Sequence, residues 1–427
     1  MINSRHYDVI VVGAGPAGST AAALLAEKGR SVLLLEKESM PRYHVGESLM
    51  PFCWFTLDRL GVTDQMEAHR FVQKLSVQFV GQEGQQSRPF YFFEHNEHPS
   101  SYTWQVERKE FDQMLYKNAS SKGAICRDSS KVVRLIKDDS TGRVGGVIVD
   151  HAPQADGEEP SRAEYTASLV IDCTGRDAMV ASKEGWRKRD PKLNKIAIWT
   201  YYRGAMRDEG LAAGSTTVAY IPNRGWFWYI PLKDDVVSLG IVAERDYLYR
   251  DPEVRDPAEI VAREIKENVW VDEHLSCGEQ FGEYWVTGEY SYRTQHTAAD
   301  GVVLAGDAFG FLDPVFSSGV FLALKSGEMV ADAADKALSK SSQPVSADFD
   351  KYGDALCDHI ETMRKIVYAF YDENFSFGRL IKAYPDLRPS LTDCLIGDVS
   401  KDFDELFLRI GEFADLPPEV ARVTTPG

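Results

Sequence analysis

Apolar runs near the start of the chain alternate with a helical pattern. Residues 7–12 (Tyr-Asp-Val-Ile-Val-Val) have the length and composition of a short buried strand, and the apolar run at residues 31–35 predicts a second one. Between them, residues 19–28 are rich in alanine and leucine and predict a helix that ends at Gly29. The order of these elements predicts a β-α-β unit.

The rest of the chain divides into a strand-rich middle and a helical end. Alternating patterns predict strands within residues 77–93 and 127–149, with a helix at residues 109–122 between them. The acidic, proline-containing residues 152–162 predict a hairpin tip or surface loop. Four strands of an antiparallel sheet are predicted at residues 196–202, 216–221, 226–232 and 236–242. A long helix is predicted at residues 319–339, and helices from about residue 346 carry an aromatic face made of Tyr368, Phe370, Tyr371, Phe375 and Phe377.

The turn between the first strand and the first helix carries candidate chemistry, Gly13-Ala14-Gly15-Pro16-Ala17-Gly18. Gly13 permits a tight turn, Gly15 lets a pyrophosphate approach the backbone, and Gly18 lets the helix pack on the strand. The free N–H groups and the dipole at the helix start favour a phosphate. Glu36, 18 residues after the last glycine, is placed to accept hydrogen bonds from a ribose. The motif predicts a bound dinucleotide, and the sequence holds no second copy of it.

Composition limits the classes of function. The chain has 427 residues, of which 44% are hydrophobic and 26% are charged, as in an ordinary globular protein with a large core. A net charge of −17 argues against nucleic acid and anionic membranes as partners. No apolar run approaches the ~18 residues of a membrane-spanning helix. The six cysteines are scattered, which favours reduced thiols over a metal site, so we expect a cytoplasmic protein without a metal.

One strand of the middle segment is aromatic on both faces. Trp226 and Trp228 are two residues apart and project to one side of an extended strand, while Phe227 and Tyr229 project to the other. Pro231 then ends the hydrogen-bonded ladder. Taken alone, such a strand is typical of a protein core, so its meaning depends on the motifs around it.

A second glycine motif indicates that the dinucleotide is FAD. Residues 301–308 form an apolar strand that ends in Gly-Asp-Ala, where the Asp307 carboxylate can accept a ribityl hydroxyl. The two glycine motifs, with residues 104–112 and 170–176, resemble the flavin monooxygenase superfamily, in which Arg108 matches a flavin-contact position. The resemblance implies an α/β fold with a Rossmann-like FAD-binding domain of the PHBH (p-hydroxybenzoate hydroxylase) type, an antiparallel β-sheet substrate domain and a helical C-terminal region.

The predicted elements suggest where these three parts lie along the chain. We assign residues 1–75, 100–180 and 299–340 to a discontinuous FAD-binding domain. Residues 76–99 and 181–298 form the β-sheet substrate domain, and residues 341–427 form the helical C-terminal region.

Three segments extend the resemblance to flavin-dependent halogenases. The Trp-x-Trp-x-Ile-Pro run at residues 226–231 resembles their signature, and residues 311–319 resemble their Phe-x-x-Pro-x-x-Ser-x-Gly segment. Lys74, downstream of Gly46-Glu47-Ser48, falls where the catalytic lysine of that family is expected. The resemblance implies FAD contacts at Gly13, Gly15, Pro16, Ala17, Gly18, Glu36, Lys37, Arg42, Ser48, Arg108, Asp307, Pro314, Gly319 and Val320.

The same resemblance implies how the reaction is divided. FAD supplied as FADH2 by a separate flavin reductase, with O2 and a chloride or bromide ion, yields hypohalous acid. Backbone N–H groups of Ser318 and Gly319 at a helix start would hold the halide. Lys74 would then present electrophilic halogen to an electron-rich aromatic substrate. A wall between flavin and substrate would be formed by Trp226, Trp228 and Phe316.

The segment after Pro314 bears on the substrate. Members of the family that act on tryptophan carry a glutamate there, whereas this chain has no acid between Pro314 and Gly319. The segment is more similar to members that act on phenols or pyrroles, often presented as carrier-protein thioesters. A local basic cluster is a candidate landing site for an acidic carrier protein, and it consists of Arg187, Lys188, Arg189, Lys192 and Lys195.

Three alternatives stay open on the sequence. An aromatic hydroxylase of the same superfamily would be reduced by NADPH and need no halide. A reductase of isoprenoid double bonds shares the Gly-Glu-Ser and Gly-Asp features, and a third alternative is a flavoprotein that binds FAD without turnover. The first two do not predict Trp226, Trp228 and Lys74 together, and an intact Lys74 weighs against the third.

Overall fold

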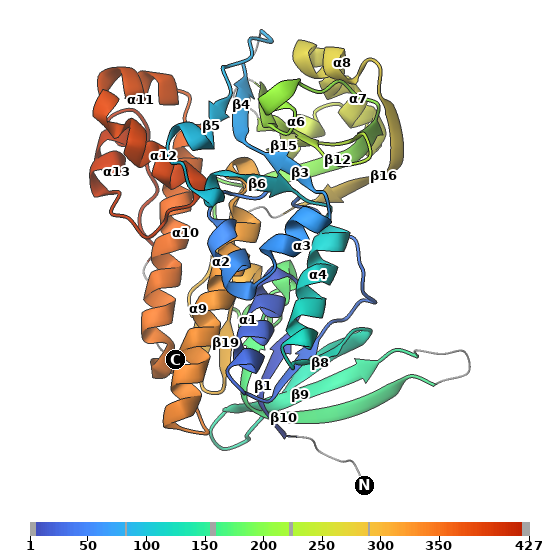
Figure 1. Cartoon of the computed structure of the whole chain (residues 1–427), viewed down its shortest axis with the longest axis vertical. Helices are drawn as coiled ribbons and strands as arrows, with labels where there is room; N and C mark the ends of the chain where they lie inside the picture. The colour runs from blue at the N-terminus through green and yellow to red at the C-terminus, as the bar shows by residue number, and fades with distance from the viewer. Residues whose placement is uncertain (1–5, 82, 154–158, 222–224, 289–290, 421–427) are drawn as a thin grey trace.

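A computed structural model of the chain shows two sheet-based parts stacked along the long axis, with two long helices running beside them (Figure 1). The structure describes residues 6–81, 83–153, 159–221, 225–288 and 291–420. Among these residues, no helix is long and apolar enough to cross a membrane.

The lower part in Figure 1 is built on a mostly parallel sheet. Its strands are β1 (His6–Val12), β2 (Val32–Leu35), β7 (Ile125–Arg127), β8 (Ser130–Lys137), β9 (Val144–His151), β10 (Ser161–Asp172), β18 (Ala298–Ala299) and β19 (Val302–Leu304). The order is β18-β19-β10-β1-β2-β7, and β8 and β9 continue antiparallel from β10. Parallel pairing brings the ends of β1, β10 and β19 together at one edge, where ligands of such sheets bind.

Six helices accompany this sheet: α1 (Pro16–Glu27), α2 (Cys53–Leu60), α3 (Thr63–Ala68), α4 (Arg108–Ser121), α5 (Met179–Lys183) and α9 (Ser318–Lys340). The first helix begins at Pro16, three residues before the predicted start, because proline is favoured in the first turn of a helix. Helix α1 packs between α4 and α9. A Cβ atom at Gly327 of α9 would lie 2.4 Å from the carbonyl oxygen of Ala17, so this glycine permits the close approach of the two helices.

The upper part is a seven-stranded sheet in the order β16-β12-β15-β14-β13-β4-β5. Its strands are β4 (Ser76–Val80), β5 (Phe90–Tyr91), β12 (Lys195–Arg203), β13 (Thr216–Ile221), β14 (Gly225–Pro231), β15 (Val236–Glu244) and β16 (Glu279–Thr287). Every pair is antiparallel, as predicted, except β4 and β13, which run parallel.

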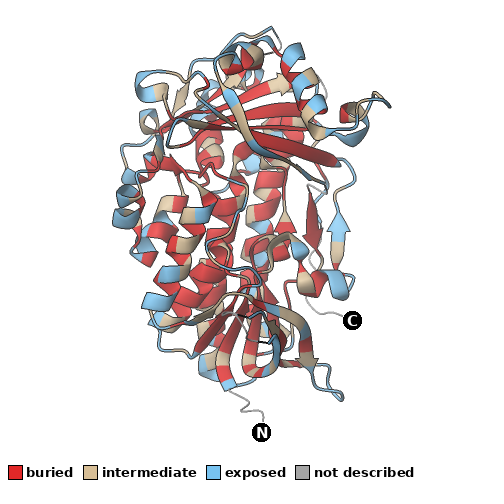
Figure 2. Ribbon diagram, turned by 90° about the vertical axis from the view of Figure 1, so that its right-hand side faces the viewer, coloured by how far each residue is buried: buried red, intermediate tan, exposed pale blue. Residues whose placement is uncertain are grey.

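Alternation along β14 divides its aromatic side chains as predicted. Phe227 and Tyr229 lie in the apolar cluster between this sheet and the helices α6 (Arg245–Leu248), α7 (Pro257–Glu267) and α8 (Val269–Leu275). Trp226 and Trp228 belong to the large core cluster on the opposite face. The central strands of both sheets are largely buried, whereas β8 and β16 are partly exposed (Figure 2). Helices α7 and α8 were not predicted, although buried Ile260, Val261 and Ile265 follow a helical spacing.

Two small sheets and the C-terminal helices complete the fold. Strand β3 (Val72–Lys74) pairs with β6 (Thr103–Gln105), and β11 (Arg187–Arg189), β17 (Tyr292–Thr294) and β20 (Gly310–Phe311) form a three-stranded sheet. The C-terminal region is helical, as predicted, with α10 (Asp350–Tyr371), α11 (Phe377–Ala383), α12 (Arg388–Ile396) and α13 (Asp404–Ile410). Figure 1 shows α11 to α13 in red, beside β5 at the edge of the upper sheet.

Candidate active site

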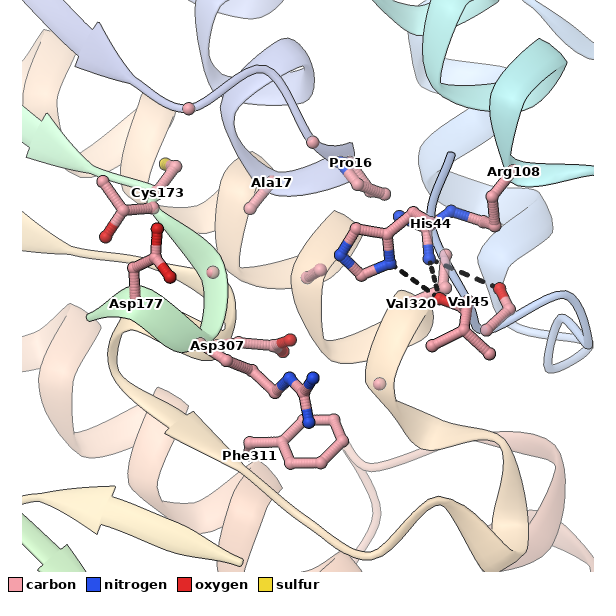
Figure 3. Close-up of a pocket in the computed structure, with 18 of the residues that line it drawn as sticks. Pro16, Ala17, His44, Val45, Arg108, Cys173, Asp177, Asp307, Phe311 and Val320 are labelled. Atoms are coloured by element: carbon pink, nitrogen blue, oxygen red, sulfur yellow. Dashed lines mark hydrogen bonds between the residues drawn. The ribbon is translucent and has the colours of Figure 1, made fainter. Parts of the chain in front are cut away.

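A cavity of 710 Å³ extends from the glycine turn after β1 to the tryptophan strand β14. We call it the flavin cavity, after the sequence prediction. Figure 3 shows Pro16 and Ala17 at the start of α1 on one side of it, and Asp307 and Phe311 on another. The cavity is therefore lined by both sheet-based parts of the molecule.

The glycine turn has the geometry that a bound pyrophosphate requires. Gly13 has a φ of +100°, and a Cβ atom there would lie 2.3 Å from the carbonyl oxygen of Cys173. A Cβ atom at Gly18 would lie 1.9 Å from the carbonyl oxygen of Gly13. Neither position accepts a larger residue without a backbone shift, so the turn presents the N-terminus of α1 directly to the cavity. The Glu36 carboxylate accepts the N–H of Ala14 at 2.9 Å and lines the cavity at the end of β2.

Two arginines beside the flavin cavity share one buried carboxylate. Arg108 donates to both Asp112 oxygens, at 2.8 and 3.0 Å, and Arg42 donates to Asp112 at 2.9 Å. Burial alone would raise the pKa of Asp112, but the positive charges of Arg108 and Arg42 lower it below its usual value. Since both arginines line the cavity, they present paired positive charge to an anionic ligand.

Asp307 lines the cavity after β19, as the Gly-Asp motif predicts. Burial raises the pKa of Asp307 to about 6, against the opposing effect of Arg176 and Arg108. The Arg176 guanidinium lies 5.5 Å from the centroid of the Phe311 ring and also lines the cavity. A carboxylate held here can accept hydroxyl groups of a ligand.

Residues 44–47 of the segment His44-Val45-Gly46-Glu47-Ser48 line the flavin cavity but were not predicted as site residues. His44 faces the open cavity, and its Nδ1 donates to the Val45 carbonyl at 2.8 Å, beside Arg108 (Figure 3). Although the side chain is open to the cavity, desolvation by the surrounding cavity wall and the charge of Arg108 lower the pKa of His44 to about 4, so the imidazole is neutral at pH 7. Glu47 also lines the cavity and accepts the hydroxyl of Tyr201 at 2.7 Å. The Gly-Glu-Ser motif at residues 46–48 is the sequence signal that could have indicated Glu47, but the sequence analysis predicts an FAD contact only at Ser48.

The lining fits an FAD molecule. Of the predicted cofactor contacts, all line the flavin cavity except Gly18, which packs on Gly13 beneath the turn. Those that line it are Gly13, Gly15, Pro16, Ala17, Glu36, Lys37, Arg42, Ser48, Arg108, Asp307, Pro314, Gly319 and Val320. Their individual contacts with FAD stay predictions.

Lys74 lies at a second, much smaller cavity of 30 Å³, which we call the lysine cavity. Its lining is Met50, Pro51, Lys74, Val77, Phe79, Phe90, Phe92, Thr216, Val218, Val315, Phe316, Ser317 and Leu395. Lys74 is 2% exposed, and its Nζ donates to Ser48 Oγ at 2.8 Å and to the Leu49 carbonyl at 3.0 Å. Burial lowers the pKa of Lys74 to about 7, against the smaller opposing effect of the nearby Cys53. Near neutral pH the side chain can therefore be an ammonium or a free amine.

Four side chains line both cavities: Thr216, Val218, Val315 and Ser317. Trp226 and Trp228 line the flavin cavity but not the lysine cavity, whereas Phe316 lines only the lysine cavity. The residues that line both cavities are therefore these four and not the predicted pair of indoles. A barrier role for Trp226 and Trp228 stays a prediction.

Polar contacts fix both indoles. Trp226 Nε1 donates to Tyr371 OH at 2.9 Å, and Tyr371 OH donates to Asp313 at 2.8 Å, which ties α10 to the segment before α9. Trp228 Nε1 donates to Ser238 Oγ at 3.1 Å. Gly240 lies opposite Trp228 in the sheet, and a Cβ atom there would lie 2.1 Å from the indole ring. A glycine at this position is therefore needed for the ring to lie where it does.

The predicted halide donors lie at the start of α9. Ser317 has a φ of +58°, α9 begins at Ser318, and the Ser317 side chain does not cap the helix. The first N–H groups of a helix have no acceptor within the helix. Gly319 lines the flavin cavity, whereas Ser318 is 1% exposed and lines neither cavity.

One member of the predicted basic cluster is not a surface charge. Lys195 is 5% exposed, pairs with Glu244 at 3.1 Å, and has its Nζ 4.5 Å from the centroid of the Tyr371 ring. It was assigned to the surface because it follows a basic loop, but it opens β12 and points into the protein core. The exposed members are Lys188, Arg189 and Lys192, and Arg187 is half-buried.

Comparisons with known proteins agree with this geometry. The profile of the tryptophan halogenase family matches residues 8–100 and 93–376. A 1H-pyrrole-2-carbonyl-[peptidyl-carrier protein] brominase of Pseudoalteromonas luteoviolacea is 32% identical over 374 residues, which are 82% of this chain and 86% of the relative. A tryptophan 2-halogenase of Chondromyces crocatus is 30% identical over 381 residues, 86% of this chain and 68% of the relative. The solved structure of the flavin-dependent brominase Bmp2 superposes with a TM-score of 0.85 at 27% identity, covering 95% of this chain and 98% of that one.

Proposed function

The chain belongs to the tryptophan halogenase family of FAD-dependent enzymes, and from that membership we propose that it halogenates a small aromatic ring at Lys74, with the ring presented on a carrier protein. The enzyme is an FAD-dependent halogenase, and a halide ion is its second reactant. The ring would be a pyrrole or a phenol, which are electron-rich enough to accept electrophilic halogen.

The observation that carries the proposal is the position of Lys74. Lys74 lines the lysine cavity, while the predicted cofactor residues, apart from Gly18, line the flavin cavity. A ring beside Lys74 would be separated from a flavin by Thr216, Val218, Val315 and Ser317. That separation favours an oxidant that travels between the cavities over direct transfer of oxygen to the ring. Reduced FAD, with O2, supplies the oxidising equivalents that turn halide into hypohalous acid.

The lining of the lysine cavity supports an apolar ring over a free amino acid. Apart from Lys74, its lining side chains are apolar except for the hydroxyls of Thr216 and Ser317. A free amino acid would bring an ammonium and a carboxylate, and burying them without partners costs several kcal/mol. A cavity of 30 Å³ holds only a few water molecules, so a ring enters only when lining side chains move.

A carrier-bound substrate fits this lining and the carrier-dependent relative. A carrier presents its ring on a long flexible arm, so the docking surface need not adjoin the cavity. The basic residues that reach the surface, Lys188, Arg189 and Lys192, with half-buried Arg187, are the proposed landing site on an otherwise acidic chain. Reversal of the three exposed charges should slow turnover of a carrier-bound ring and leave turnover of the free ring unchanged.

The remaining residues have supporting roles. The N-terminus of α1 and Glu36 would hold the pyrophosphate and ribose, and Asp307 would accept a ribityl hydroxyl. The N–H groups at the start of α9, near Gly319, would hold the halide at the flavin cavity. FADH2 would come from a separate flavin reductase, because the sequence holds one dinucleotide motif and not two.

One assay tests the proposal. The protein is incubated with FAD, a flavin reductase, NADH, O2 and bromide, with a pyrrole-2-carbonyl thioester on a carrier protein, free pyrroles, phenols and tryptophan as substrates. Mass spectrometry should find a brominated pyrrole or phenol with the parent and none with Lys74→Ala, while both oxidise FADH2. A matched control is Lys233→Ala, which removes a lysine that pairs with Glu110 away from both cavities. A hydroxylated product, or normal bromination by Lys74→Ala, would contradict the proposal.

A further inference from the structure

Two buried hydroxyl groups connect Lys74 with the flavin cavity. Lys74 Nζ donates to Ser48 Oγ at 2.8 Å, and Ser48 Oγ lies 2.8 Å from Thr216 Oγ1. Ser48 lines the flavin cavity, and Thr216 lines both cavities. Both residues are 4% exposed. The three groups therefore form a continuous hydrogen-bonded path from the lysine to the larger cavity.

The hydrogen bonds around Thr216 leave one hydrogen for this path. Gln105 Nε2 donates to Thr216 Oγ1 at 2.8 Å and to the Gly214 carbonyl at 3.0 Å, which uses both amide hydrogens. Either hydroxyl can donate in the Ser48–Thr216 hydrogen bond, and when Ser48 donates, Thr216 Oγ1 accepts from both Gln105 and Ser48. In that orientation the hydroxyl hydrogen of Thr216 has no acceptor among the hydrogen bonds of the described residues. That hydrogen is available to a group in the flavin cavity.

The other surroundings of Lys74 offer no route for a proton. Its second acceptor is the Leu49 carbonyl, which has no proton to pass on. No carboxylate pairs with Lys74 within the part of the chain that the structure describes, and no arginine or histidine there affects its pKa. Cys53, the one titratable group that acts on Lys74, keeps its proton because burial raises the pKa of its thiol to about 12. On the side of the lysine cavity, Nζ meets the Phe92 ring at 5.7 Å and other apolar side chains.

We propose that Ser48 and Thr216 form a proton path that sets the protonation state of Lys74 from the flavin cavity. This inference rests on the proposed role of Lys74. In the outward direction the Lys74 ammonium gives a proton to Ser48 Oγ, Ser48 gives its hydroxyl proton to Thr216, and Thr216 gives its own to water or hydroxide in the flavin cavity. One N–H bond breaks, one O–H bond forms on that base, and both hydroxyls are restored with their orientation reversed.

The path has a purpose because only the free amine has a lone pair for electrophilic halogen. When hypohalous acid meets the amine, an N–X bond forms, the O–X bond breaks, and the released hydroxide takes one amine proton to give water. An ammonium cannot react in this way. A lysine enclosed by apolar side chains exchanges its proton slowly unless polar groups carry it, so the hydroxyl pair keeps the amine available during turnover.

The test is the pH dependence of bromination by Thr216→Val, which keeps the shape of the side chain and removes the hydroxyl. Below pH 7 the lysine is mostly an ammonium, so bromination should fall by about tenfold to a hundredfold. As the pH rises to 9 the resting lysine becomes an amine, and the variant should approach the parent. Hypohalous acid captured by a soluble trap should not decrease. Thr216→Ser restores the hydroxyl and should restore the parent pH profile.

The neighbouring residue provides a matched control. Thr217 is also buried on β13, and its Oγ1 accepts from Gln78 Nε2 at 2.8 Å, so Thr217→Val loses an equivalent hydrogen bond on the opposite face. It should leave the pH profile unchanged. Ser48→Ala interrupts the path at its other hydroxyl and should give the same pH profile as Thr216→Val. It replaces Thr216→Val as the test if Thr216→Val folds poorly, as judged by FAD titration and thermal unfolding.

The outcomes separate this inference from the proposed function. Equal pH profiles for Thr216→Val, Ser48→Ala and the parent, with Lys74→Ala inactive, would overturn the proton path and leave the halogenase role intact. Normal bromination by Lys74→Ala would overturn the role of the lysine itself, and the proton path with it.

Discussion

The flavin cavity and the lysine cavity share four lining residues but hold charge in different ways. In the flavin cavity, Arg42 and Arg108 are paired with Asp112 at hydrogen-bond distances. In the lysine cavity, Lys74 has two neutral acceptors and no counter-ion among the described residues. The charges of Arg42 and Arg108 are therefore balanced by a carboxylate, whereas the charge of Lys74 is held at a cost to stability. The difference points to function, since proteins tolerate such a cost where activity needs it.

The largest expected effect comes from removing the buried carboxylate that pairs with two arginines of the flavin cavity. Asp112→Asn leaves Arg108 buried without a negative partner and leaves Arg42 with only the more distant Glu36, at 3.6 Å, so the free energy of unfolding should fall by about 3–5 kcal/mol. Urea unfolding of the two proteins measures this difference. The matched control is Asp332→Asn, where a half-exposed carboxylate pairs with Arg59 at 2.7 Å and the expected loss is about 1 kcal/mol or less. Equal losses at both positions would show that the burial of Asp112 has no special energetic weight.

In the lysine cavity, removing the charged side chain should raise the free energy of unfolding rather than lower it. Lys74→Met keeps a long unbranched side chain and removes the unpaired charge, so the variant should be more stable than the parent at pH 7. One pKa unit corresponds to about 1.4 kcal/mol, and the pKa of Lys74 is lowered from 10.5 to about 7. Loss of the hydrogen bonds to Ser48 and Leu49 offsets part of this, and we expect a net gain of about 1–3 kcal/mol.

Lys195 supplies the control for that gain. It is also buried, but it pairs with Glu244, so Lys195→Met should not stabilise the protein. A loss of stability in Lys74→Met would mean that the lysine is not held at an energetic cost, which would remove the contrast between the two cavities.

The gain should also depend on pH in a defined direction. Between about pH 7 and 10.5 the unfolded parent binds the Lys74 proton and the folded parent has lost it, so the stability of the parent rises with pH in this window. Lys74→Met lacks this titration. The difference between the two proteins should therefore be largest at or below pH 7 and shrink as the pH rises toward 10. Urea unfolding at pH 6, 8 and 9.5 measures it, and a constant difference would contradict a lowered pKa.

The two cavities also differ in how far the sequence predicts them. The turn at Gly13 and Gly18 and the carboxylate of Asp307 lie within short motifs, because a nucleotide is held by backbone geometry at the ends of adjacent strands. The sequence therefore predicts most of the flavin cavity, together with the α/β fold and the helical C-terminus. The antiparallel sheet was likewise predictable, since β12 to β15 are short runs rich in β-branched and aromatic residues.

The lysine cavity is assembled from segments far apart in the chain. Thr216 meets Ser48 across 168 positions, and Leu395 reaches the cavity from α12. Each is an ordinary residue in its own segment, so no local pattern marks it. Resemblance to a family identified Lys74, but the shared wall depends on sheet pairing and helix packing, which local sequence does not encode. Lys195 shows the same limit of local sequence. The basic run in which it lies predicts an exposed side chain, whereas the sheet pairing of β12 buries it.

The smallest expected effect tests the link between the tryptophan strand and α10. Tyr371→Phe removes the hydroxyl that accepts from Trp226 Nε1 and donates to Asp313, both of which are buried. The loss should be about 1–2 kcal/mol, because each group loses one partner but retains its packing. Tyr384→Phe is the control, since that hydroxyl donates to Glu412 at the surface, and it should cost less than about 0.5 kcal/mol.

The pH dependence of Tyr371→Phe decides whether Asp313 is responsible. Burial raises the pKa of Asp313 to about 6, and the Tyr371 hydroxyl holds it lower than burial alone would. Without that donor the pKa rises further, so the deficit of the variant should be small at pH 5, where the carboxyl is protonated in both folded proteins. It should grow as the pH rises through 6 to 8, because the unpaired group must then ionise in the folded state. A loss of stability that is equal at pH 5 and pH 8 would mean that the lost hydrogen bond to Trp226 accounts for all of it. The Tyr371–Asp313 hydrogen bond, which joins α10 to the segment before α9, would then not depend on the charge of Asp313.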